Sequence, residues 1–429
     1  MSRARGPHPH RPASALGGGI LAALVLFVSW PAGAQEDPIG GPGPFTPGQL
    51  PGQVPVGDNT EPPVQSALPP QAVAPHRWEF ALEAHEGWDD HPTFVESPDA
   101  VSSFSTGASG SLSFKQPTRR GTVSLFGAGS FLRYDSLVGH DGFMWAAGGS
   151  GSRRLSTSTD LAGQVSYRST YTQEVESLIR AGLLLPLTVA KTISSNATLS
   201  HRFSKVTTLT TYAHYERYNF DSPEFVDGDS LNAGAILNRA LAGEASLGVS
   251  YDWFRSDPDG GPLLDFHSVY VNASRRFGRR VSAYGALGGS YYKQPGGGEG
   301  FPIVGNARLM ARWTQTGFSL LYDHSTSQAY GLGVQRIADT ASVDAERRFG
   351  RRVSFTASYA YGDSRDILQE STHYRTHAVR GNLSWNLSGG FILEGRGTYW
   401  LTTYSLTTGP VRTTNVGCAL ALSYTGRWR

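Results

Sequence analysis

Cysteine is almost absent from this sequence of 429 residues, in which Cys418 is the single one. A lone cysteine cannot form an intramolecular disulfide, which excludes the disulfide-stabilised scaffolds among secreted proteins. No cysteine lies near residue 34, so we expect no lipid anchor at that point. The fold must therefore be held by other interactions.

Charge and long apolar runs are also scarce. Charged residues make up 17% of the chain and the formal net charge is +2, so no nucleic-acid partner is predicted. Beyond residue 34 no stretch approaches the roughly 18 apolar residues that a membrane-spanning helix needs, which excludes a helical membrane protein. The mean hydropathy of −0.29 still allows a membrane barrel, because each strand of a barrel turns alternate residues to lipid and to water.

The N-terminal region predicts an exported protein. Basic residues precede an apolar run at 20–28, which ends in a small-x-small cleavage pattern at 32–34. We therefore expect residues 1–34 to be a secretory signal peptide. Residues 35–76 contain eleven of the 25 prolines and predict a Pro/Gly-rich linker in the periplasm. That linker is either a plain spacer or a docking segment for a periplasmic partner.

What the sequence does contain is typical of strands and turns, with 52 Gly, 19 Tyr and 20 Phe. From Trp78 onward apolar and polar residues alternate. The segment 78–89 places Trp78, Phe80, Leu82 and Ala84 on one face and Glu79, Glu83, His85 and Asp89 on the other. The same alternation recurs at 353–361, 379–387 and 416–424, as expected when one strand face meets lipid and the other meets water.

A repeat separates a membrane barrel from a soluble sandwich, which would also alternate. The string RRFGRRVS occurs at 275–282 and again at 347–354, and aromatic residues recur every 36 residues at Phe277, Trp313, Phe349 and Trp385. Thirty-six residues hold two strands, a tight turn and a longer loop, which is the unit of an up-and-down barrel. Aromatic residues at one level of every hairpin predict an interfacial girdle. The predicted girdle comprises Phe203, Phe277, Trp313, Phe349, Trp385 and Trp428.

Residues 77–429 are therefore predicted to form an all-β, transmembrane, antiparallel up-and-down β-barrel of the bacterial outer-membrane type. Counting by the repeat gives about eighteen strands, with about sixteen as the alternative. Tight connections at 278–280 and 350–352 are expected on the periplasmic side, and longer ones such as 172–188 outside. A barrel of this width leaves an aqueous channel.

The inward faces of the predicted strands are rich in arginine with carboxylates between. The predicted contacts of the lumen with a passing polymer are Arg168, Arg202, Arg308, Arg312, Arg336, Arg380, Arg396, Glu79, Glu83, Glu394 and Trp400. The same face is assigned Arg276, Arg348, Asp252, Asp344 and Glu346. Guanidinium forks favour anionic or polyhydroxyl solutes, although these charges can also pair across the wall and merely solvate it. Inward rings at Tyr134, Tyr270, Tyr284, Tyr292 and Trp400 form a candidate stacking track for sugars.

No catalytic, cofactor or metal site is predicted. The Asp89-Asp90-His91 run is the most suggestive cluster, since carboxylates beside an imidazole can activate water. It lies where a strand meets a loop, and no second cluster completes a site. Helical His-Glu-x-x-His and Gly-x-Ser-x-Gly motifs are both absent from the sequence.

The first predicted strand resembles a known family. Phe80, Ala84 and the run Gly87-Trp88-Asp89-Asp90-His91-Pro92 are similar to the first-strand signature of the β-barrel porins encoded beside exopolysaccharide synthesis and export genes, with His91 where that family has Asn. The resemblance implies an outer-membrane pore for a secreted polysaccharide. It also implies a periplasmic polysaccharide-export protein as a partner of the linker.

The leading hypothesis is thus a passive conduit for exopolysaccharide, integral to the bacterial outer membrane, without chemistry of its own. A general or nutrient-uptake porin is the alternative, an outer-membrane barrel hydrolase ranks third, and a structural or adhesive barrel ranks fourth. Other expected partners are outer-membrane lipid, lipopolysaccharide and the outer-membrane assembly machinery.

Overall fold

The computed structural model describes residues 77–90, 102–136, 141–171, 188–223, 225–261, 263–293, 298–329, 334–366, 373–406 and 409–428. The predicted signal peptide 1–34, the predicted linker 35–76, and His91 and Pro92 lie outside these residues.

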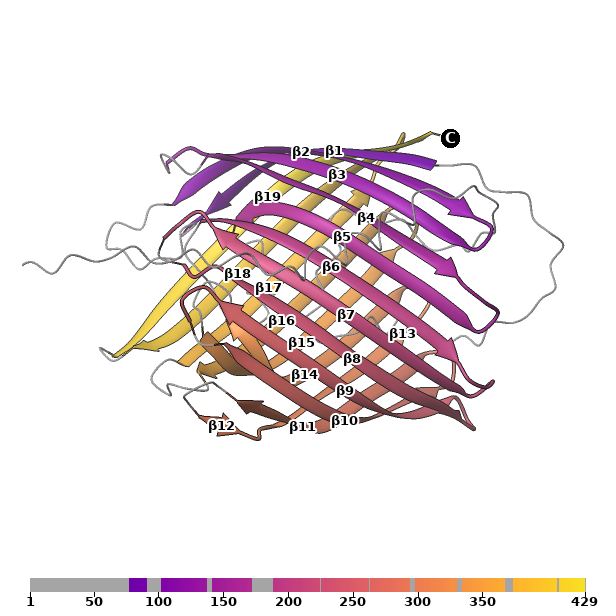
Figure 1. Ribbon diagram of the computed structural model, residues 1–429. Coiled ribbons are helices and arrows are strands. Elements are labelled where there is room, and N and C mark those ends of the chain that lie inside the picture. Colours follow the sequence, from indigo (N-terminus) through magenta and orange to yellow (C-terminus); the bar gives the residue numbers. More distant parts are fainter. Residues whose placement is uncertain are drawn as a thin grey trace, which may run out of the picture.

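The described residues form one antiparallel sheet of consecutive strands (Figure 1). The strands are β1 Arg77–Asp89, β2 Ser103–Thr118, β3 Gly121–Tyr134, β4 Gly142–Arg154, β5 Thr159–Tyr171, β6 Val189–Arg202, β7 Thr207–Phe220, β8 Gly228–Leu241, β9 Ala245–Pro258, β10 Leu264–Phe277, β11 Val281–Lys293, β12 Glu299–Gly300, β13 Ile303–Arg312, β14 Thr316–Ala329, β15 Val334–Phe349, β16 Val353–Asp366, β17 His373–Asn386, β18 Phe391–Leu406 and β19 Gly409–Trp428.

The sheet closes on itself. β1 pairs with β2 on one side and with β19 on the other, where the register runs from Trp78 opposite Trp428 to Asp89 opposite Gly417. The short β12 and the following β13 both pair with β11 and together make one crossing, so the nineteen strand segments form eighteen crossings. The prediction of an eighteen-stranded closed barrel is confirmed, and the sixteen-stranded alternative is wrong.

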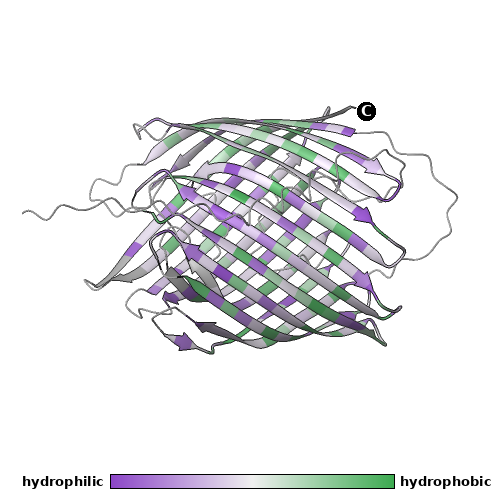
Figure 2. Ribbon diagram, viewed as in Figure 1, coloured by the Kyte–Doolittle hydropathy of each residue, from purple (hydrophilic) through white to green (hydrophobic). Residues whose placement is uncertain are grey.

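Hydrophobic and hydrophilic residues alternate along many of the strands (Figure 2), and alternate residues of a strand face opposite sides of the wall. On β10 the odd-numbered Val269 and Val271 are 53% and 56% exposed, whereas the even-numbered Phe266 and Asn272 are buried. Where a strand has exposed large apolar residues, they lie on one parity of that strand, and the cross-strand pairs carry the same parity around the barrel without a slip. The outer wall is therefore apolar and the inner wall polar, as a membrane barrel requires. In the part of the chain that the structure describes, no helix has the length and apolarity to span a membrane.

Short turns join the strands at one end of the barrel, here called the short-turn end. The two copies of RRFGRRVS build the same turn, because Gly278 and Gly350 adopt positive φ values of 65° and 68°. A residue with a Cβ is strained in that conformation, which explains a glycine at the same place in both copies. The opposite end, where β1 finishes at Asp89, is here called the loop end.

The predicted girdle residues gather at the short-turn end. Phe203 and Trp313 lie in turns, and Phe277, Phe349 and Trp385 lie at or next to the last residue of their strands. All five are exposed on the outer face, between 45% for Trp313 and 61% for Phe203. Trp428 pairs through its backbone with Trp78 at the same end, and its side chain is outside the described part.

Candidate functional site

The lumen is the candidate functional site, because the inner wall gathers polar side chains from every strand. Along each strand, alternate residues point to the lumen, and we call this set the inward parity. Each predicted lumen residue belongs to it, whereas the exposed apolar side chains belong to the other set. Two sectors of this wall differ in chemistry. The first is a neutral sector of hydroxyl and amide side chains in the middle of β3 to β6, and Arg168 and Arg202 lie nearer the ends of these strands. The second is a charged sector that runs from β15 through β19 to β1.

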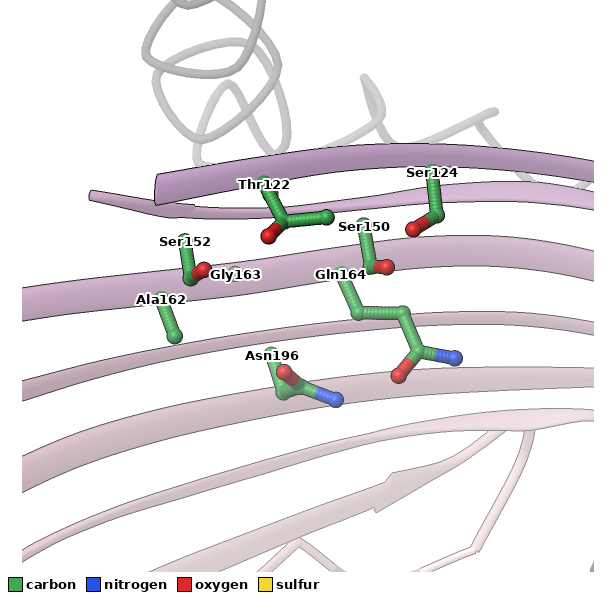
Figure 3. A pocket seen from close by; sticks show the side chains of 9 residues that line it. Thr122, Ser124, Ser150, Ser152, Ala162, Gly163, Gln164 and Asn196 are labelled. Atoms are coloured by element: carbon green, nitrogen blue, oxygen red, sulfur yellow. The ribbon is translucent and has the colours of Figure 1, made fainter. Parts of the chain in front are cut away.

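The neutral sector is lined by small hydroxyls and amides. Figure 3 shows Thr122, Ser124, Ser150, Ser152, Gln164 and Asn196 side by side on this wall. Small side chains on β3 and β4 leave a shallow hollow there, and Ser166 and Ser194 continue the row of hydroxyls with a hydrogen bond of 2.8 Å between them. Such a surface can donate to and accept from a hydroxylated or charged solute, and it carries no net charge of its own.

In the charged sector Arg396 forms the densest cluster. Its guanidinium donates to both carboxylate oxygens of Glu83 at 3.1 and 2.9 Å, and to Glu394 Oε2 from Nε at 3.1 Å and from Nη2 at 2.6 Å. Arg396 belongs to β18 and Glu83 to β1, so the side chain crosses the whole of β19. The crossing is possible because the inward residue of β19 beneath it is Ala421, which is 1% exposed. The cluster fastens the closing seam of the barrel from inside.

Two further arginines of this sector stack on rings. The guanidinium carbon of Arg380 lies 4.8 Å from the Trp400 ring centroid, and that of Arg336 lies 4.4 Å from the Tyr374 centroid. Arg336 is fully buried and also donates to the Ser364 hydroxyl at 3.0 Å and to its carbonyl at 2.6 Å. These contacts hold both side chains against the wall. The side chains of Arg336, Arg380 and Arg396 are therefore engaged in contacts within the barrel wall.

Four predicted lumen residues remain available to a solute. Arg168, Arg202, Arg308 and Arg312 are exposed on the inner wall, and within the described ranges none of them has an acidic partner. Arg308 and Arg312 lie on β13, whereas Arg168 lies on β5 and Arg202 on β6. In the sheet, strands β7 to β11 separate the two groups. The charged side chains free to meet an anion thus project from two separate parts of the wall.

Sequence reasoning missed several inward carboxylates. Asp160, Glu216, Asp323 and Asp366 share the inward parity and bring the wall close to charge balance. Several are occupied by neighbours: Asp160 accepts from Arg154 at 3.3 Å, and Asp323 is buried beside the Ser325 hydroxyl. The parity rule that found the arginines would also have found these residues, had the strand ends been known.

The inner wall is buried at the loop end and open at the short-turn end. Inward residues near the loop end have almost no exposed surface, including Ser256 at 0% and Ser290 at 0%. Phe266 on β10 and Val304 on β13 are each 1% exposed. Near the short-turn end, in contrast, the inward Arg202 and Arg312 are exposed.

The chain is a closed all-β barrel with an apolar outer wall. Its structure is similar to OccK2 (OpdF) of Pseudomonas aeruginosa in complex with glucuronate, with 12% identity, a TM-score of 0.48, and coverage of 82% of this chain and 98% of that one. It is also similar to OccAB4 of Acinetobacter baumannii (14% identity, TM-score 0.45, 83% and 99% covered) and to Pseudomonas aeruginosa OpdK with vanillate (14% identity, TM-score 0.46, 82% and 99% covered). These likenesses concern barrel architecture alone. The sequence matches no protein-family model and no curated protein.

The Asp89-Asp90 pair of the first-strand motif has a structural role. Asp89 accepts a hydrogen bond from Asn415 Nδ2 at 2.5 Å, and Asp90 Oδ1 accepts one from the backbone N–H of Val416 at 2.6 Å. Both acceptors therefore fasten β1 to β19 at the loop end of the same seam that Arg396 crosses. Within the described ranges no group of three His, Cys, Asp or Glu residues is arranged to hold a metal ion.

The five rings proposed as a stacking track face inward but do not form one surface. Tyr134 is on β3 and Trp400 on β18, with β19, β1 and β2 between them. Tyr292 packs instead against Phe266, with 5.6 Å between ring centroids, and Phe266 packs against Phe254 at 5.9 Å. These rings form a cluster on β9 to β11.

Proposed function

We propose that this barrel is a nutrient-uptake porin, a passive channel for small hydrophilic solutes that favours anions such as sugar acids and other carboxylates. The observation that carries the proposal is the set of exposed inward arginines without acidic partners, Arg168, Arg202, Arg308 and Arg312. An unpaired guanidinium in a water-filled lumen attracts anions and offers a carboxylate two parallel hydrogen bonds. The neutral hydroxyl sector supplies partners for the rest of a polyhydroxylated solute. The channel needs no chemistry of its own for this role.

The free arginines and the neutral sector suit small hydrophilic anions, whereas polymer export has a different basis. Export of exopolysaccharide rests on the first-strand resemblance, and Asp89 and Asp90 of that motif are used to close the seam. The motif thus bears on how the barrel closes and does not identify its cargo. Export keeps its own test: deletion of the gene would leave a polymer trapped inside the outer membrane.

The proposal is tested by ion selectivity in planar bilayers. An arginine about 8 Å from a passing anion in water contributes about 0.5 kcal/mol. The double variant R308Q/R312Q should therefore lower the anion-to-cation permeability ratio by at least about fivefold, since the anion loses about 1 kcal/mol of attraction and the cation loses the matching repulsion; the ratio is read from the reversal potential in a salt gradient. The matched control is R351Q/R352Q, which removes two arginines from a turn outside the lumen wall and should leave the ratio close to the wild-type value. Equal permeability to both ions in the wild-type protein would overturn the proposal.

A further inference from the structure

The RRFGRRVS repeat places its four arginines on three different surfaces. Arg275 lies on the outward parity of β10 with Val271 and Phe277, and the next residue, Arg276, faces the lumen. Arg279 and Arg280 follow in the turn. The second copy repeats the arrangement, with Arg347 outward, Arg348 inward and 351–352 in the turn. An arginine on the lipid-facing side of a barrel is costly unless it finds a polar partner at the interface.

From this arrangement we propose that each copy of the repeat binds the headgroup phosphate of an anionic phospholipid, with Arg275 and Arg347 as the primary ligands. In bacterial barrels the short turns lie on the periplasmic side, which places the site in the inner leaflet of the outer membrane. Guanidinium groups pair bidentately with phosphate oxygens. The lipid class inferred is one with net negative charge, such as phosphatidylglycerol.

Both Arg275 and Arg347 are exposed. Arg275 has Ala245 and Ala283 as its cross-strand neighbours, so no large side chain covers it. Its guanidinium carbon lies 5.1 Å from the centroid of Phe277, and that of Arg347 lies 5.2 Å from Phe349. The girdle ring supports the long side chain and holds its charged end at the level where headgroups begin.

Charge complementarity selects an anionic occupant. The turns of the short-turn end contain seven basic residues, Arg119, Arg120, Lys205, Arg279, Arg280, Arg351 and Arg352, against the single acidic residue Glu244. Across the described ranges neither Arg275 nor Arg347 has an acidic partner. Arg348, the inward neighbour of Arg347, does have one, because it donates to Glu346 at 2.8 Å. The outward arginines are thus left for a ligand from outside the chain.

The position of the side chains favours a lipid over the other anions. A solute in the lumen meets Arg276 and Arg348, which lie on the other face of the wall. An acidic protein in the periplasm would meet the turn residues Arg351 and Arg352 first. A group that projects from the outer wall beside the aromatic girdle is next to lipid headgroups.

The experiment is native mass spectrometry of the full-length folded barrel with phosphatidylglycerol and phosphatidylethanolamine competing in the same micelles. The wild-type protein should retain phosphatidylglycerol preferentially. The variant R275Q/R347Q should weaken this binding about fivefold at each site, the factor expected for one basic residue at an anionic surface. The matched control R276Q/R348Q removes the same number of arginines from the adjacent positions and should keep the preference.

Each other outcome overturns the proposal. A wild-type protein without preference, or equal loss in the two variants, would mean that the outward arginines are not the ligands. Loss in R351Q/R352Q with retention in R275Q/R347Q would assign the anion to the turns and fit an acidic protein instead. Heat-modifiable mobility on gels shows that every variant is folded, so that lost binding is not lost structure.

Discussion

Replacing Arg396 with methionine removes the centre of the cluster that fastens β18 to β1. The substitution leaves Glu83 and Glu394 facing each other without a cation, and their side chains are only 15% and 20% exposed. Breaking a fully buried pair costs about 3 to 5 kcal/mol, and an exposed pair contributes about 0 to 1 kcal/mol. Because the Arg396 side chain is 38% exposed, we expect a loss between these limits. The expected decrease in the free energy of unfolding is about 2 kcal/mol.

The assay is urea unfolding of the barrel in lipid vesicles, followed by tryptophan fluorescence. A double-mutant cycle of R396M with E83Q should give a coupling energy above about 1 kcal/mol, since the two side chains contact each other directly. Arg308→Met is the control, because it removes an inward arginine with no acidic partner in the described part and should cost less than about 0.5 kcal/mol. A coupling energy near zero would refute the conclusion that Arg396 fastens the seam.

Further predictions follow from the wall and the turns. Cys418 is exposed on the outward parity of β19, so a membrane-soluble maleimide should label it and a charged, water-soluble thiol reagent should not. In a background with C418S, A419C should show the opposite labelling, and the same labelling for both positions would contradict the assigned faces. The substitution G278A forces a Cβ into the left-handed region and should lower the unfolding free energy by about 1 to 2 kcal/mol in urea titrations. Gly381 has nothing within 4 Å of an added Cβ, so G381A should have a smaller effect. Equal effects of the two glycine substitutions would contradict the conclusion that the positive φ of the turn requires glycine at position 278.

The sequence predicts the barrel well because its main signals are local. Alternation gives the facing of each strand, and a repeat of 36 residues gives the number of hairpins, so the strand count and the inward parity needed no tertiary information. The lumen residues followed from the same parity. Even Trp400, in a strand with several glycines nearby, lies on the face that the pattern assigns to it.

The partners of those residues could not be predicted, because they depend on contacts between distant strands. Arg396 and Glu83 are 313 positions apart and meet only because Ala421 of the strand between them is small. In the sequence alone Arg396 and Arg308 cannot be distinguished, because each is an inward arginine of a strand. In the described part of the chain Arg308 has no acidic partner. The difference between a structural arginine and one free to attract solutes is thus a property of the closed wall. The same holds for Asp89, whose role depends on Asn415.

The pairing of β1 with β19 also has a consequence for biogenesis. Residues 77–89 meet their second partner only after more than three hundred intervening residues have been inserted. Until then the growing sheet has two unpaired edge strands. Their backbone amide and carbonyl groups cannot be left without hydrogen bonds in hydrocarbon. We therefore expect a copy lacking Gly409–Trp428 to be degraded rather than inserted as a smaller channel.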